Sequence, residues 1–234
     1  MGGLRPPTNP HPQIFEKIRE MALQIARSLQ DRRRICVWLG FLGSLYAIQQ
    51  RFEQALVLVR EALALAEALN DPRIASYRWW ECGRIWLSIG EFVKAEHCFG
   101  KAYDLSVGET NYQAMLALGI ARYCQQQPAA EQFERAADDC QIRLQITPDL
   151  YDVQYTLATA RVGQAICDQC WSDTFRRASL LVPALAEYHR ALAITAAPGV
   201  LRDALRDLEL ILAAGVEGLE PVFELLEGAL DEQH

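Results

Sequence analysis

Lysine is scarce in this sequence, which limits the partners that it can have. Only three lysines occur, at positions 17, 94 and 101, and the formal net charge of the 234 residues is −7. Surfaces that bind nucleic acid carry clustered lysine and arginine, so we expect no nucleic-acid partner. No lysine or arginine follows Arg206, and acidic residues gather there instead. We interpret them as a solvated helix face, with a site for a basic partner as the alternative.

Long apolar runs and flexible linkers are missing as well. No stretch of about 18 apolar residues is present, so we expect no membrane-spanning segment. No Gly-rich or Ser-rich linker interrupts residues 13–232, which we interpret as a single domain. Residues 1–12 are rich in proline and lack the apolar region of a secretory signal, so we expect a disordered lead-in.

The seven cysteines do not form a disulfide pattern. They are odd in number and scattered, which is typical of reduced thiols in a cytoplasmic protein. Only Cys167 and Cys170 have the spacing of a metal or redox pair. A zinc site needs four ligands, and no histidines stand at the spacing that would complete one. A thiol redox or metal sensor centred on these two cysteines remains an alternative function.

Catalytic motifs are absent too. The sequence has no glycine-rich phosphate loop, no H-E-x-x-H and no G-x-S-x-G. His97 and Cys98 are adjacent on a predicted helix, so their side chains point in different directions and cannot act as base and nucleophile. We therefore predict a protein that is not an enzyme and that uses no cofactor.

What the sequence does contain is an internal repeat, which is the first feature to seek in a chain of this kind. Residues 79–102 can be laid on residues 39–62 with a constant offset of 40. The spacing within each copy describes two amphipathic helices whose small residues lie where the helices cross. The matched pairs are Leu39 with Trp79, Gly43 with Gly83, Tyr46 with Trp86, Ala55 with Ala95, Val59 with Phe99 and Ala62 with Ala102.

This pattern resembles that of the tetratricopeptide repeat (TPR) family, W-x2-L-G-x2-Y followed by A-x3-F-x2-A. The second copy shows it as Trp79, Cys82-Gly83, Trp86, Ala95, Phe99 and Ala102. Residues 61–72 look like the 40-residue variety found in kinesin light chains and similar adaptors. The resemblance implies an all-α fold, in which antiparallel helix pairs stack into a right-handed superhelix.

The repeat divides the chain into successive units. We predict a half repeat at 13–31, full repeats at about 33–71, 73–106, 112–147 and 150–195, and C-terminal capping helices at 199–232. About fourteen extra residues, 166–179, separate the two helices of the fourth repeat. They are either an insertion, often functional in repeat proteins, or a lengthening of the first helix.

The concave face is the candidate binding surface, because the first helix of each repeat lines it in stacked helix pairs. Aromatic and arginine side chains, which often anchor partners, are among the positions that point into it. The predicted lining residues are Ser44, Ile48, Tyr77, Trp80, Arg84, Leu87, Gln113, Leu116, Ile120, Tyr123, Tyr155 and Thr159. Some relatives clamp a peptide's terminal carboxylate with Lys, Arg and Asn here. Because this sequence offers Ser44, Arg84, Ile120 and Thr159 instead, we expect no such clamp.

These observations predict a cytoplasmic, non-enzymatic adaptor that binds a peptide or helix of a partner protein in an apolar and aromatic groove. We expect it to be monomeric without that partner. The structural alternative is a fixed subunit or assembly factor of a larger complex, which would use the convex face and the acidic C-terminal helices.

Overall fold

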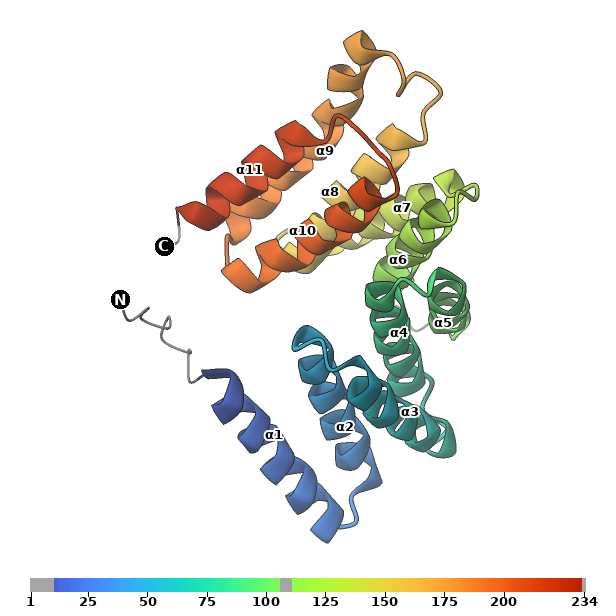
Figure 1. The fold of residues 1–234 in the computed structure, drawn as a ribbon, viewed down its shortest axis with the longest axis vertical. Helices are drawn as coiled ribbons and strands as arrows, with labels where there is room; N and C mark the ends of the chain where they lie inside the picture. The colour runs from blue at the N-terminus through green and yellow to red at the C-terminus, as the bar shows by residue number, and fades with distance from the viewer. Residues whose placement is uncertain (1–10, 106–110, 233–234) are drawn as a thin grey trace, which may run out of the picture.

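The computed structural model describes residues 11–105 and 111–232, and the regular structure within them is entirely helical (Figure 1). Residues 1–10 of the predicted lead-in therefore lie outside the described residues. Eleven helices occupy the described residues: α1 His11–Ser28, α2 Arg32–Ile48, α3 Phe52–Ala68, α4 Pro72–Ile89, α5 Phe92–Asp104, α6 Asn111–Cys124, α7 Ala130–Ile146, α8 Tyr151–Ile166, α9 Thr174–Ile194, α10 Pro198–Ala213 and α11 Glu220–Asp231.

Helices α2 to α9 form four consecutive pairs. Each first helix packs on its own partner and also on the second helix of the preceding pair, and α1 packs on α2 as such a second helix would. The pairs follow one another along an arc in Figure 1. The predicted all-α solenoid is thus confirmed. None of the described helices is long and apolar enough to cross a membrane.

Glycines allow the two helices of a pair to cross closely. A Cβ atom on Gly43 would lie 2.6 Å from Cγ2 of Val59, and one on Gly83 would lie 2.5 Å from Cε1 of Phe99. Both distances are too short for any Cβ atom. Val59 and Phe99 are fully buried at these crossings. The small residues of the repeat therefore lie where the helices cross, as the spacing predicts.

The helix ends repeat at the same offset of 40 residues. Asp31 caps α2 by accepting a hydrogen bond from the Arg34 backbone amide at 3.0 Å, and Asp71 caps α4 by accepting from that of Arg73 at 3.1 Å. Gln50 and Gly90, again 40 apart, follow the two helices with φ values of 61° and 85°. In both repeats, the first helix thus begins at an aspartate that caps it and ends before a residue in the left-handed conformation.

The fourth pair holds the extra residues. Helix α8 ends at Ile166, a loop covers residues 167–173, and α9 is the longest helix, with 21 residues. Asp173 caps α9 by accepting from the Phe175 amide at 2.9 Å. The extra length is therefore shared between a loop and the start of the second helix. The first helix, with 16 residues, is not lengthened.

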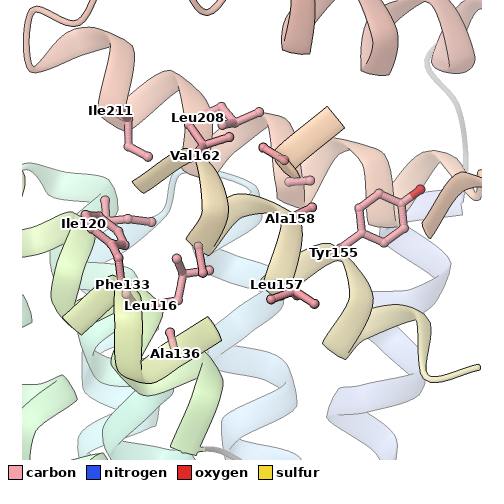
Figure 2. Packing of buried hydrophobic residues seen from close by; sticks show 14 of the residues in the cluster. Leu116, Ile120, Phe133, Ala136, Tyr155, Leu157, Ala158, Val162, Leu208 and Ile211 are labelled. Atoms are coloured by element: carbon pink, nitrogen blue, oxygen red, sulfur yellow. The ribbon is translucent and has the colours of Figure 1, made fainter. Parts of the chain in front are cut away.

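Helix α10 leaves the stack and covers part of its concave face. It packs across α6 and α8, and in the described part of the chain it makes no comparable contact with α9. Leu208 and Ile211 are fully buried there, and Figure 2 shows them reaching from α10 toward Val162 of α8 and Ile120 of α6. Helix α10, the first part of the predicted capping segment 199–232, thus covers the inner surface of the array.

Candidate functional site

A cavity of about 1120 Å³ lies between the concave faces of α2, α4, α6 and α8 and the inner side of α10. The first helices of the repeats form one wall, as expected of a TPR-type stack. Helix α10 supplies the opposite wall, which the sequence analysis did not anticipate. The site is therefore a partly enclosed chamber rather than an open groove.

Nine of the twelve predicted lining residues lie on this wall, and three do not. Leu87 and Ile120 are buried in the core that extends from α4 to α10 and do not line the cavity. Tyr123 is half-buried and packs against the same core. The nine residues on the wall are Ser44, Ile48, Tyr77, Trp80, Arg84, Gln113, Leu116, Tyr155 and Thr159.

The most accessible apolar part of the wall comes from α2 and α4. Ile48 is 68% exposed, although it belongs to the cavity lining. Tyr77 and Trp80 are half-buried, and their ring centroids lie 5.5 Å apart. The Trp80 Nε1 donor is buried and has no hydrogen-bond partner among the described residues. This aromatic pair can receive an apolar side chain of a partner on its rings.

Tyr155 and Thr159 reach the cavity but are occupied by structural contacts. The Tyr155 hydroxyl donates to the Thr195 carbonyl at 2.7 Å, and Thr159 Oγ1 lies 2.8 Å from the Tyr188 hydroxyl. Burial raises the pKa of Tyr155 to about 12. These polar groups hold α8 against α9, so the α8 side of the cavity offers few free partners to a ligand.

Arg84 joins the two walls of the cavity. Its guanidinium pairs with the Asp207 carboxylate of α10 and lies 6.0 Å from the centroid of the Trp80 ring. Burial lowers the pKa of Arg84, but the charges of Asp207 and Asp203 and the hydrogen bond to Asp207 together raise it by more, so the net shift is upward and the charge persists. The ion pair places a fixed charge beside the aromatic pair.

A buried ion pair lies beneath the α2 and α4 wall. Arg78 Nη1 is 2.7 Å from Glu81 Oε2, and Ser44 donates to Glu81 Oε1 at 3.0 Å. Burial raises the pKa of Glu81 more than the Arg78 charge and the Ser44 hydroxyl lower it. A Cβ atom on Gly40 would lie 1.1 Å from Arg78 Nη1, so only glycine leaves room for the guanidinium.

Arg78 and Glu81 are not among the predicted site residues, although a comparison of the two repeats singles them out. The offset of 40 places these two charged residues on Trp38 and Phe41 of the first copy. A charged pair at positions that are apolar in the preceding repeat marks a departure from a purely structural pattern. The departure falls beside the cavity.

Carboxylates outnumber guanidinium groups on the cavity wall. Tyr112 donates to Asp152 at 2.7 Å, and Arg206 pairs with Asp203 at 3.0 Å. An excess of negative charge favours a partner segment that carries a basic residue. The carboxylates are Glu81, Asp152, Asp203, Asp207 and Glu209, and the guanidinium groups are Arg84, Arg143 and Arg206.

The two candidate sensor cysteines lie outside the cavity, at the loop that follows α8. Burial raises the pKa of Cys167 to about 11, so this thiol is protonated at neutral pH. Arg176 donates to the Cys170 sulfur at 3.2 Å. Within residues 11–105 and 111–232, no group of three or more His, Cys, Asp or Glu side chains is arranged to hold a metal ion.

Helix pairs that cross at small residues and stack around a concave surface are the architecture of TPR-like helical repeats. No family model matches the chain. A protein of Treponema pallidum (strain Nichols) named TPR repeat-containing protein is 30% identical over 95 residues. That match covers 41% of this chain and 11% of the relative, so the chain spans about a tenth of the relative's length.

Two solved structures share the fold. One, from Podosopora anserina, is named a kinesin light chain with nearly identical TPR-like repeats; it is 13% identical, with a TM-score of 0.53 over 78% of this chain and 89% of that one. The other is BtubC (BKLC) from P. vanneervenii, 20% identical, with a TM-score of 0.53 over 94% and 89%. The repeats of this chain therefore share the fold of these TPR-like structures.

Proposed function

We propose that this protein is an adaptor that binds a segment of a partner protein in the cavity, without catalysing a reaction. The observation that carries the proposal is that the paired Tyr77 and Trp80 rings and the exposed Ile48 side chain line the same concave wall. Aromatic side chains in a concave apolar surface are frequent anchors of protein interfaces.

The size of the cavity supports a peptide or helix as the occupant. Sites for small molecules usually enclose about 300–1,000 Å³. The cavity here, at about 1120 Å³, is larger than that range. Its charged groups are engaged with one another, as in the pairs Arg84 with Asp207 and Arg206 with Asp203, which is typical of a binding surface rather than of a reaction centre.

The chemistry of the wall narrows the class of partner. An aromatic or aliphatic side chain would pack on Tyr77, Trp80 and Ile48, and a neighbouring lysine or arginine would face the exposed carboxylate of Glu209 on α10. All seven cysteines are free thiols, which supports the cytoplasmic compartment for this interaction.

Selection from a randomised peptide library tests the proposal. Peptides that bind the wild type are measured against Ile48→Gln and against the control Val57→Gln, whose parent side chain is 64% exposed on α3 outside the cavity. We expect apolar and basic residues to be enriched. Ile48→Gln should weaken binding about tenfold, as the loss of an interface anchor does. Equal binding to both variants would place the peptides elsewhere and overturn the proposal.

A further inference from the structure

Helix α1 carries an exposed apolar stripe along the side that faces away from α2. Its members are between 50% and 62% exposed, although each is a large apolar side chain. Their spacing of three or four residues places them on one face over about four helical turns. The stripe consists of Ile14, Phe15, Ile18, Met21, Ile25 and Leu29.

Four of the charged residues of the same helix contact the neighbouring repeat, whereas Lys17 is exposed. The terminal helix of a repeat array normally turns a polar face to water. Here the polar groups are used against α2 and α3, and the apolar groups are left outside. Four contacts hold them there: Glu16 with Arg51 at 2.7 Å, Arg19 with the Phe41 carbonyl at 2.7 Å, Glu20 with the Tyr46 hydroxyl at 3.4 Å, and Arg27 with Glu61 at 2.9 Å.

The repeat register shows that this face is built to receive a helix. The offset of 40 places Phe15 and Ile18 on Ala55 and Leu58 of α3. At those positions α3 packs on α2, because a Cβ atom on Gly43 would lie 3.3 Å from the Ala55 carbonyl oxygen and 3.6 Å from Leu58 Cβ. In α1, the equivalent surface lacks the helix that would cover it.

We propose that a second copy of this chain supplies that helix, so that two α1 helices pack antiparallel about a two-fold axis. An axis between positions 21 and 22 places Ile18 opposite Ile25 of the partner subunit. It also places Ile14 opposite Leu29 of the partner subunit. The stripe is therefore complementary to itself, which a two-fold interface requires. The stripe itself contains no charged side chain, and the exposed Lys17 borders it.

This interaction surface is separate from the cavity, and it revises the monomer expected from the sequence. That expectation followed from a groove that needs no second copy. A second α1 has the matching length and apolar spacing.

Sedimentation equilibrium of the full chain over a wide concentration range tests the proposal. We expect the mass to rise from 26.4 kDa toward twice that value. The variant Ile18→Asp/Ile25→Asp should stay at 26.4 kDa with unchanged helical circular dichroism, because both side chains are already half exposed. The control Ile142→Asp, at a position 59% exposed on α7, should still dimerise.

Cysteine cross-linking checks the geometry of the same interface. Under mild oxidation Met21→Cys should form a covalent dimer, because position 21 lies next to the axis, and Ile14→Cys should not. Wild type gives the background from the native free thiols. A wild type that stays monomeric, a dimer that survives the Ile18 and Ile25 substitutions, or faster cross-linking of Ile14→Cys would each overturn the proposal.

Discussion

Arg84 of α4 and Asp207 of α10 form an ion pair between segments 123 residues apart in the sequence. Both side chains are mostly buried at the edge of the cavity. The pair fixes helix α10 across the concave face of the repeats, so it decides which part of that face stays accessible. The shape of the candidate binding site therefore depends on this contact between α4 and α10.

We predict that Asp207→Asn lowers the free energy of unfolding by about 1–3 kcal/mol. That range lies between the free energy lost when an exposed ion pair is broken and the free energy lost when a buried ion pair loses one partner. Urea denaturation measures the change, and hydrogen exchange should show faster opening of α10. The control is Asp203→Asn, on the same helix but 67% exposed, which should change stability by less than about 0.5 kcal/mol. Equal effects of the two variants would contradict a locking role for the pair.

Gly40→Ala is expected to destabilise the protein by about 3 kcal/mol. The new methyl group would occupy the position of the Arg78 guanidinium and would separate it from Glu81 in a buried environment. The control is Gly100→Ala within α5, where an added Cβ atom would meet no neighbouring atom within 4 Å. Removing a helical glycine there should stabilise the protein by about 0.5–1 kcal/mol. Thermal unfolding of both variants distinguishes a steric effect from a general glycine effect.

Gln50→Gly should stabilise the protein by about 0.5–1 kcal/mol. Gln50 has a φ of 61°, a conformation that costs a non-glycine residue free energy, and its counterpart 40 residues on is Gly90. Gln49→Gly is the control, because Gln49 has a φ of −80°. Chemical denaturation should show a gain for Gln50→Gly and none for Gln49→Gly; a loss at position 50 would contradict the strain argument.

The docking of α1 should weaken in acid. The hydrogen bond from Arg51 lowers the pKa of Glu16 more than partial burial raises it. A carboxyl whose pKa is lower in the folded state stabilises that state fully above the unfolded value of about 4.5, and loses this effect as the pH falls through the lower folded value. Thermal melts of wild type and Glu16→Gln should therefore differ at neutral pH and converge in acid. Glu227→Gln, at an exposed position of α11, controls for the change in net charge.

The sequence predicted the repeats well because their defining contacts are local. Gly43 meets Val59, and Gly83 meets Phe99, within single helix pairs, so one spacing specifies each crossing. The same register predicted most of the concave wall, including Trp80. Contacts between neighbouring helices require certain residue types at regular spacings, and a single sequence shows these spacings.

The position of α10 could not be predicted in this way. An amphipathic stripe that includes Leu208 and Ile211 predicts a helix, but it does not specify which surface the helix covers. Ile120 was assigned to the groove for the same reason, since it lies on the concave side of α6 yet is covered by α10. Pairs such as Arg84 with Asp207 depend on the folded path of the chain, and no local pattern records them.

Hydrogen exchange with and without a library-selected peptide tests the binding site most directly. If the peptide occupies the cavity, protection should appear in α4 around Trp80, near Ile48 at the end of α2, and on the inner side of α10. The Val57 segment of α3, outside the cavity, should be unchanged. Protection confined to the convex helices α3 and α5, or to the acidic helix α11, would contradict a cavity-binding adaptor and would favour an assembly role for the outer surface.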